Sequence, residues 1–388
     1  MKKFFLASFL ALSINMFSQA EFQIVCGPYL QRITDTEATI VWLTNKNAVS
    51  WVELAPDDST HFYAKERPQY FQTRIGKKEV GTTHAVPLKN LEPGTFYRYR
   101  IYSQEVLGGN GSSTQYGKIV ATKIFQSNPL RFKTLDMKKT AFSFEMVNDI
   151  HENNELLSSL LNNVKSEKVD FVIYNGDMVS DMRSAEKVPD GFLSKSAEMF
   201  AAEIPFYMAR GNHETRGLFA DTYMNYFPSP TGLPYYSFQQ GSTFFIVLDS
   251  GEDKPDSDIE YGGLAAFDAY RMEEAEWLKK LVAGDAYKAA KHKIVIVHMP
   301  PMPNHWHGPT MVKDIFVPIL NEAGVDLMLC GHLHKHFYYD KNYGGCQFPV
   351  LINANKNKVR VDVSENSLLV KALNAENKPE FEVKLTGK

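Results

Sequence analysis

A chain of 388 residues, 44% of them hydrophobic and 22% charged, is long enough for two or three domains. This composition excludes long disorder, and a core of this size needs no disulfide or metal to stabilise it. The formal net charge of −3 becomes −5 without Lys2 and Lys3, which argues against broad nucleic-acid binding.

Residues 1–20 predict a secretory signal peptide. Lys2 and Lys3 precede a mostly apolar run over residues 4–16, and small residues allow cleavage near Ala20. The run is shorter than the roughly 20 apolar residues of a spanning helix, and no later stretch is long and apolar enough to span a membrane. We therefore expect an exported protein that is periplasmic, held at the cell surface or released.

Three cysteines leave at least one thiol free, even though export would permit disulfides. Cys330 lies inside an apolar run, where a small buried side chain is the simplest interpretation. A disulfide between Cys26 and Cys346 is the alternative for the other two.

Residues 21–136 have the pattern of an all-β domain. Residues 38–44 are β-branched and aromatic, and residues 97–102 alternate in the manner of a half-buried strand. A Pro-Gly turn stands just before Tyr97, and in β-sandwiches this arrangement lets the tyrosine hydroxyl bond back to the corner. The stretch resembles a fibronectin type III domain. We expect a sandwich that packs on the second domain, with carbohydrate or partner binding as the alternative.

Strands alternate with helices in residues 137–388. Apolar runs predict strands, and helical spacing predicts helices over residues 156–164, 272–281 and 311–321, the last bent at Pro318. The predicted strands are residues 142–147, 170–174, 205–208, 243–247, 292–297 and 325–329. Residues 350–355, 359–363 and 368–373 alternate like antiparallel strands and are expected to complete a second sheet. This pattern predicts an α/β layered fold with ligands at the carboxyl ends of strands.

Side chains of the metal-ligand type follow these strands directly. In chain order they are Asp149 and His151, Asp177, Asn212 with His213, His298, and His332 with His334. Each motif alone is common in proteins, but five in order at strand ends are hard to explain as core packing. Five of the 11 histidines fall inside them. We therefore predict that these residues converge on one edge of the sheet.

The mixture of imidazole and carboxylate ligands suits Fe, Mn or Zn, and the scarcity of cysteine argues against a structural zinc site. The carboxylate of Asp177 has two oxygens, so it can bridge two cations. Two ions about 3.5–4 Å apart would clamp a phosphoryl group and lower the pKa of a bound water from 15.7 towards about 7.

The motifs over residues 143–336 resemble the calcineurin-like metallophosphoesterase superfamily, and the two-domain arrangement is similar to purple acid phosphatases. The resemblance implies two metal sites that share Asp177, with His213 contacting the phosphoryl group and assisting departure of the leaving group. One site would use Asp149, His151, Asp177 and His334, and the other Asp177, Asn212, His298 and His332. The purple enzymes have glycine in place of His151, and their metal-binding tyrosine would fall near Ser180, so we expect a colourless enzyme.

Four further residues are candidates for substrate contact. His305 and His307 follow the His298 strand on a proline-rich loop, with plain solvent exposure as the alternative. Arg210 and Arg216 flank Asn212 and His213 and could neutralise phosphate charge, but we favour a structural ion pair for each.

The sequence therefore predicts an exported two-metal phosphoesterase that uses a metal-bound hydroxide, most simply a phosphomonoesterase similar to acid phosphatases. Its substrate would be a small or exposed phosphate ester. A phosphodiesterase at the same site is the alternative within the class. A secreted binding or adhesion protein without activity is the rival from another class.

Overall fold

The computed structural model describes residues 20–110, 112–125, 128–302 and 306–386. Residues 1–19 of the predicted signal peptide and the predicted contact residue His305 lie outside the described residues. All three cysteines are buried and free, so the Cys26–Cys346 disulfide does not form. No helix in the described part of the chain is long and apolar enough to cross a membrane.

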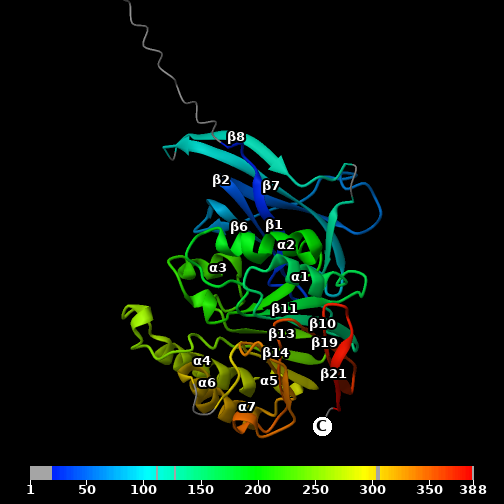
Figure 1. Ribbon diagram of the computed structural model, residues 1–388. Helices are drawn as coiled ribbons and strands as arrows, with labels where there is room; N and C mark the ends of the chain where they lie inside the picture. The colour runs from blue at the N-terminus through cyan, green and yellow to red at the C-terminus, as the bar shows by residue number, and fades with distance from the viewer. Residues whose placement is uncertain (1–19, 111, 126–127, 303–305, 387–388) are drawn as a thin grey trace, which may run out of the picture.

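The N-terminal domain is built from one seven-stranded sheet and a small hairpin (Figure 1). The long strand β2 pairs with β1 and β6 through its first half and with β7 through its second half. The strands are β1 (Ile24–Gln31), β2 (Ala38–Pro56), β3 (Gln69–Phe71), β6 (Val80–Leu88), β7 (Phe96–Gly109), β8 (Thr114–Ala121) and β9 (Leu130–Lys133), with β4 (Thr73–Arg74) and β5 (Lys77–Lys78) in the hairpin. The amide of Glu92 donates to the hydroxyl of Tyr97 at 2.9 Å, which confirms the predicted tyrosine contact at the corner.

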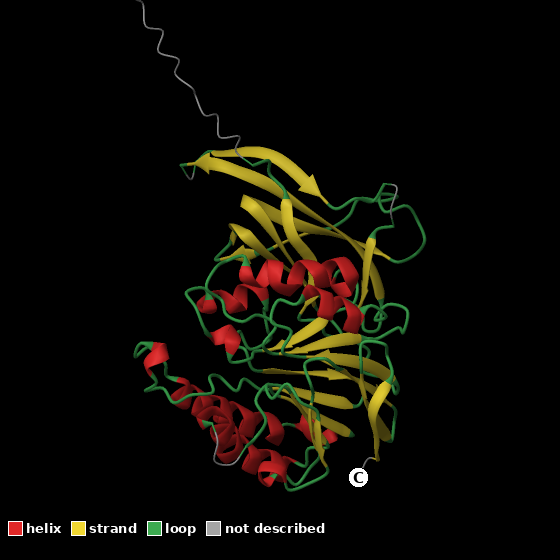
Figure 2. Ribbon diagram, in the orientation of Figure 1, coloured by secondary structure: helices red, strands yellow, loops and turns green. Residues whose placement is uncertain are grey.

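Two six-stranded sheets form the centre of the second domain, and helices cover the outer face of each (Figure 2). The first sheet has the order β12-β11-β10-β19-β20-β21, with parallel pairing among β10, β11 and β12. Its strands are β10 (Phe142–Val147), β11 (Phe171–Asn175), β12 (Phe206–Ala209), β19 (Lys358–Val363), β20 (Ser367–Leu373) and β21 (Pro379–Thr386).

The second sheet has the order β13-β14-β15-β16-β18-β17, with parallel pairing from β14 to β18. Its strands are β13 (Tyr236–Gln240), β14 (Thr243–Val247), β15 (His292–Ile296), β16 (Leu327–Cys330), β17 (Phe337–Tyr339) and β18 (Val350–Ile352). All six predicted strands of the α/β pattern are present. The expectation for the last three strands was wrong in part, because β19 and β20 extend the first sheet and only β18 joins the second.

Helical segments lie on the outer face of each sheet, and the apolar core between the sheets includes Phe144, Phe171 and Phe245. The first sheet is covered by α1 (Asn154–Leu161), η1 (Pro189–Leu193), α2 (Ser194–Ser196), η2 (Ala197–Ala201) and α3 (Tyr223–Tyr226). The second is covered by α4 (Phe267–Ala283), α5 (Asp285–Ala289), α6 (His307–Met311), η6 (Val312–Phe316) and α7 (Val317–Ala323). Short turns are η3 (His213–Thr215), η4 (Ala220–Thr222), η5 (Ile259–Tyr261) and η7 (Tyr343–Gly345).

The N-terminal domain packs against the helical layer of the first sheet (Figure 1). The hydroxyl of Tyr29 donates to the carbonyl of Tyr226 at 3.0 Å, and the hydroxyl of Tyr99 donates to the carbonyl of Ala202 at 2.6 Å. All four residues are buried, so these hydrogen bonds form away from bulk water. The first sheet therefore lies between two neighbours. The N-terminal domain and the helical layer are on one side of it, and the second sheet is on the other.

Candidate metal centre

The candidate ligands stand on turns that follow parallel strands, and several of these turns have left-handed backbone. The φ angles are +53° at Asp149, +47° at His151, +54° at Asp177, +70° at His332 and +55° at His334. Residues other than glycine rarely adopt this conformation, which costs roughly 1–3 kcal/mol at each position. Strain of this kind is typical of sites where side-chain direction matters more than local stability.

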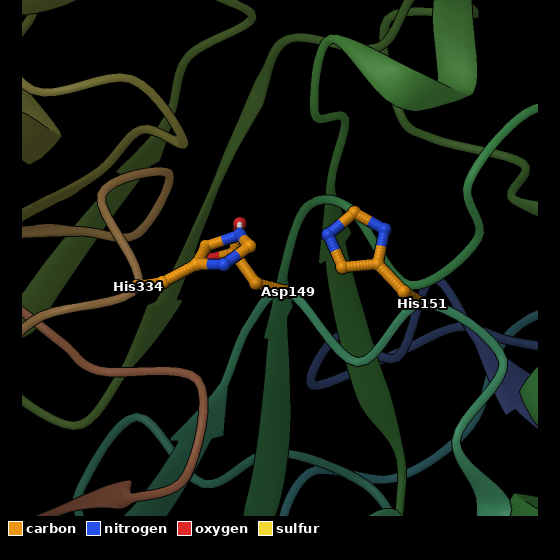
Figure 3. Close-up of side chains that lie close together, drawn as sticks. All are labelled: Asp149, His151 and His334. Atoms are coloured by element: carbon orange, nitrogen blue, oxygen red, sulfur yellow. Dashed lines mark ion pairs between the residues drawn. The ribbon is translucent and has the colours of Figure 1, made fainter.

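Asp149, His151 and His334 form the first group. Their ligand atoms lie within 4.8 Å of one another, with Nε2 of His334 3.0 Å from Oδ1 of Asp149 (Figure 3). The second oxygen of Asp149 accepts from the amide of His332 at 2.9 Å and from the side chain of Asn148 at 2.6 Å. The bond to Asp149 raises the pKa of His334, and burial lowers the pKa of His151.

Asp177, His298 and His332 form the second group, again with ligand atoms within 4.8 Å. His298 has Nε2 3.0 Å from Oδ2 of Asp177 and Nδ1 2.7 Å from the carbonyl of Asn175. A proton on Nδ1 would be donated to that carbonyl, which leaves the lone pair on Nε2 for a metal. Asn212 joins the group through Oδ1, which is 3.1 Å from Nδ1 of His332.

In the second group, Asp177 is held in its charged carboxylate form, which favours a cation beside it. Burial favours the neutral carboxyl of Asp177, but the charge and hydrogen bond of His298, together with the contribution of His213, hold the pKa of Asp177 well below its usual range. Burial likewise opposes the charge on His298, but Asp177 and Asp149 raise the pKa of His298 to about 10. His332 has no such dominant partner, and burial lowers its pKa to about 4. A bound metal would take the place of the proton on His298.

The spacing of the side chains fits metal coordination. Neighbouring ligand atoms on one ion, each about 2.1 Å from it, are separated by roughly 3 Å. The oxygen-to-nitrogen distances in the pairs Asp149–His334, Asp177–His298 and Asn212–His332 are 3.0, 3.0 and 3.1 Å. Asp177 also lies within 4.8 Å of His151 in a third group with His213, so it connects the two main groups.

His213 lies beside the shared carboxylate. Its amide donates to Oδ1 of Asp177 at 3.0 Å, and its Nδ1 is 2.7 Å from the carbonyl of Ser180. The ring packs edge-on against His151 with centroids 4.9 Å apart, and Nε2 is 3.9 Å from Oδ2 of Asp177. Because Nδ1 is engaged by a carbonyl, Nε2 is the nitrogen that faces the candidate centre.

Glu214 has a structural role that the sequence pattern does not indicate. Its buried carboxylate accepts from the amides of Asp177 and Gly211 through Oε2 and from the amide of Met178 through Oε1, at 2.9, 2.9 and 2.7 Å. Burial and the nearby charge of Asp177 raise the pKa of Glu214 to about 7. Glu214 therefore ties the turn after β11 to the turn after β12, and neither periodicity nor charge in the sequence marks it for this role.

Two glycines allow these turns to approach closely. A Cβ on Gly211 would lie 2.1 Å from Oδ1 of Asp177. A Cβ on Gly176, which has a φ of +78°, would lie 2.4 Å from Nδ1 of His298. Any larger residue at either position would displace a candidate ligand.

Three of the four predicted substrate-contact residues lie in the described part of the chain, and each of the three is engaged by a carboxylate. Arg210 pairs with Asp249 at 2.6 Å, and Arg216 pairs with Glu252 at 2.6 Å and with Asp253 at 3.3 Å. These contacts are the structural ion pairs that the sequence favours for both arginines. His307 pairs with Asp268 at 2.7 Å at the start of α6. Beside it, Trp306 is 46% exposed and packs edge-on against His332, with ring centroids 5.0 Å apart, a contact that the sequence analysis did not anticipate.

Comparisons with known proteins find phosphoesterase family models and a phosphatase relative. Residues 145–336 match the family model "calcineurin-like phosphoesterase", and residues 28–124 match "purple acid phosphatase, N-terminal domain". The chain is 24% identical over 183 residues to the serine/threonine-protein phosphatase CPPED1 of Bos taurus. That match covers 45% of this chain and 56% of the relative, so the chain spans little more than half the length of the relative.

Among solved structures, the chain is similar to the phosphoesterase Yfce from E. coli, with a TM-score of 0.32 and 10% identity over 63% of this chain and 100% of that one. It is also similar to a cold-active protein-tyrosine phosphatase from a psychrophilic Shewanella species, with a TM-score of 0.32 and 11% identity over 95% of this chain and 100% of that one. The family matches extend over both domains. Residues 145–336 belong to the calcineurin-like phosphoesterase family, and residues 28–124 belong to the family of purple acid phosphatase N-terminal domains.

Proposed function

We propose that this protein hydrolyses phosphate esters, most simply monoesters, at a two-metal centre shared by Asp177. The observation that supports this function best is the set of oxygen-to-nitrogen pairs about 3 Å apart, drawn from the ends of strands in both sheets. Apolar packing does not explain these pairs, because four of the six paired residues, Asp149, Asp177, His332 and His334, have left-handed backbone that aims polar atoms at one another.

The metal ligands that we propose are those on the turns after β10, β11, β12, β15 and β16. One ion would be held by Asp149, His151, Asp177 and His334, and the other by Asp177, Asn212, His298 and His332. This donor set suits Fe, Mn or Zn. When bound, two such ions neutralise charge on the phosphoryl oxygens and make a water molecule acidic enough to supply hydroxide near neutral pH. Purple acid phosphatases owe their colour to a metal-binding tyrosine, and by resemblance Ser180 takes the place of that tyrosine here. We therefore expect no visible absorption band.

His213 is the group that we propose for proton transfer. Its Nδ1 is engaged by the carbonyl of Ser180, and its side chain is 28% exposed, so Nε2 is available to a substrate beside Asp177. From this position it would hydrogen-bond the phosphoryl group and donate a proton to the departing oxygen. The amide hydrogen bond to Asp177 holds the backbone of His213 in place for this role.

The test is the metal content of the purified protein combined with hydrolysis of p-nitrophenyl phosphate and bis-p-nitrophenyl phosphate. About two Fe, Mn or Zn ions per chain, with activity lost on chelation and restored by metal, would support the proposal. Faster hydrolysis of the monoester would favour the phosphomonoesterase, and faster hydrolysis of the diester would favour the alternative. No bound metal and no hydrolysis with any added metal would favour the binding or adhesion protein.

We also propose that residues 1–20 are a signal peptide and that residues 21–136 are a fibronectin type III-like sandwich accessory to the catalytic domain. The basic start and apolar run support export. Expression of the full chain in a secreting host, followed by N-terminal sequencing, tests the proposed signal peptide. A mature terminus near Glu21 is expected, and retention of Met1 in the cytoplasm would contradict it.

A further inference from the structure

Ser180 connects the proposed proton donor His213 to a carboxylate outside the candidate metal centre. The carbonyl of Ser180 lies 2.7 Å from Nδ1 of His213. The amide and the hydroxyl of Ser180 donate to the carboxylate of Glu152, at 2.9 Å to Oε1 and 2.7 Å to Oε2. Glu152 is therefore linked to the ring of His213 through a single residue, although it belongs to none of the three groups of candidate ligands.

The loop after β11 is fixed on either side of Ser180. Before it, the amide of Met178 donates to the buried carboxylate of Glu214 at 2.7 Å. After it, the amide of Met182 donates to the carbonyl of Arg216 at 2.7 Å. Ser180 lies between these two points and is only partly buried, so the direction of its carbonyl depends on its own two hydrogen bonds to the carboxylate.

Several contacts fix Glu152 in the position that these hydrogen bonds require. Its φ of +58° is left-handed, as at His151 beside it, a conformation that is rare in residues other than glycine. Its amide donates to the carbonyl of Met178 at 3.0 Å, and Nζ of Lys187 donates to its Oε1 at 2.8 Å. A Cβ on Gly191 would lie 3.0 Å from Cγ of Glu152, so the glycine leaves room for the side chain.

The direction of the His213 ring matters for the proposed reaction, because only one ring nitrogen can face the departing oxygen. A carbonyl can only accept, so Nδ1 carries a proton in the contact with Ser180, and Nε2 is left for the substrate. If the carbonyl turned away, the ring could rotate. A displacement of about 1 Å in a reacting group can lower a rate roughly 10²-fold.

We propose that Glu152 is a positioning residue that acts through Ser180 to hold His213 in the orientation for proton donation. This inference rests on the phosphoesterase activity proposed above and adds a residue to its site. Lys187 supports the arrangement through its ion pair with Glu152. Loss of Glu152 should therefore reproduce part of the loss of His213 and leave the metal ions bound.

The test uses the metal-loaded full chain and two monoesters, p-nitrophenyl phosphate with a good leaving group and phenyl phosphate with a poor one. Glu152→Ala should lower kcat for phenyl phosphate roughly tenfold or more, as for other residues that orient a functional side chain. The loss for p-nitrophenyl phosphate should be much smaller, because its leaving group needs less help from a proton donor.

Glu152→Gln should restore most of the lost activity. The glutamine oxygen can accept from the amide of Ser180, and the hydroxyl of Ser180 can accept from the glutamine NH2, so both contacts survive without the charge. Glu198→Ala is the matched control, because it also removes a carboxylate that pairs with a lysine, Lys195 at 2.7 Å, and should behave as wild type.

A double-mutant cycle separates positioning from a general structural role. Glu152→Ala should cause no further loss in the His213→Ala background, because the side chain that it positions is then absent. Lys187→Met leaves both contacts to Ser180 in place and should give a smaller loss with the same dependence on the leaving group, which keeps the test available if Glu152→Ala does not fold. Metal content is measured in every variant, because the hydroxyl of Ser180 is 3.5 Å from Nδ1 of the candidate ligand His151.

Equal losses for the two esters, a loss that Glu152→Gln does not reduce, or the same loss with and without His213 would overturn the inference. A fall in metal content that accounts for the loss would also overturn it, because Glu152 would then act on the ligand His151. In each of these cases the wild type still hydrolyses both esters. If the wild type hydrolysed neither ester, the proposed phosphoesterase function would fail, and this inference would fail with it.

Discussion

The two sheets of the second domain supply different atoms to the candidate centre. Strands of the first sheet end in oxygen donors, Asp149, Asp177 and Asn212, with His151 as an additional imidazole. Strands of the second sheet end in the imidazoles His298, His332 and His334. The close pairs join one residue from each sheet, as in Asp177–His298 and Asp149–His334. Neither sheet alone presents a complete ligand set, so the centre depends on how the two sheets meet.

Two buried asparagines at the ends of first-sheet strands form hydrogen bonds that hold the two sheets in their relative position. The side-chain amide of Asn175 donates to the carbonyl of Val297, just after β15, at 3.3 Å and to that of Leu329, in β16, at 3.2 Å. Asn148 and Asn353 exchange two hydrogen bonds. Nδ2 of Asn148 donates to the backbone carbonyl of Asn353 at 3.2 Å, and Nδ2 of Asn353 donates to Oδ1 of Asn148 at 2.8 Å. Each asparagine directly precedes a turn that carries a candidate ligand. The register of the sheets and the geometry of the centre are thus set by the same contacts.

Removal of one ligand from each sheet is expected to have the largest effect. Asp177→Ala and His298→Ala should each lower kcat/KM roughly 10³-fold or more, because each loses several kcal/mol of transition-state stabilisation by metal. Metal analysis should show fewer ions per chain in both variants. Substitution of the distant His61 serves as a control, and activity near wild type in either ligand variant would show that one sheet suffices.

Loss of the proposed proton donor should have the next largest effect. His213→Ala should lower kcat roughly 10²-fold, the lower end of the range for general acid–base catalysis. Metal content should stay at the wild-type level, which separates this residue from the ligands. A loss that is the same for esters with good and poor leaving groups would contradict the role in proton donation.

Glu214→Gln should weaken metal binding without removing a ligand. The carboxylate oxygens of Glu214 now accept from backbone amides of both turns. In glutamine one of these oxygens becomes an NH2 donor, which repels the amide that faces it, so we expect the turns after β11 and β12 to move apart. We expect the metal affinity to fall about 10- to 100-fold, as for other residues that orient ligands. Titration of the metal-free protein measures this affinity, and the exposed Glu155→Gln is the matched control.

Asn175→Ala should have the smallest effect. It removes the two side-chain hydrogen bonds to the second sheet and leaves the carbonyls of Val297 and Leu329 without that donor. We expect a loss of about 1–3 kcal/mol in the free energy of unfolding. Urea denaturation of the metal-free chain measures it. An unchanged midpoint would show that apolar packing between the sheets, and not the asparagine, holds them together.

The sequence by itself determined where the six strands of the α/β pattern lie along the chain, the change from an all-β to an α/β pattern and the contact of Tyr97. These features are local, because strand period, turn residues and the position of a ligand after a strand are written in consecutive residues. The candidate ligands could be named for the same reason, since each follows an apolar run directly.

Only the tertiary structure decided which sheet β19 and β20 join, how Glu214 and Asn175 are used, and which carboxylates engage Arg210 and Arg216. Each of these depends on a partner that is distant in sequence or chosen among several similar groups. The bond from Asn175 to Val297 spans 122 residues, and Asp149 accepts from the amide of His332 across 183 residues. A buried polar side chain takes its role from the groups that the fold brings to it, and its own neighbours in the chain do not specify those groups.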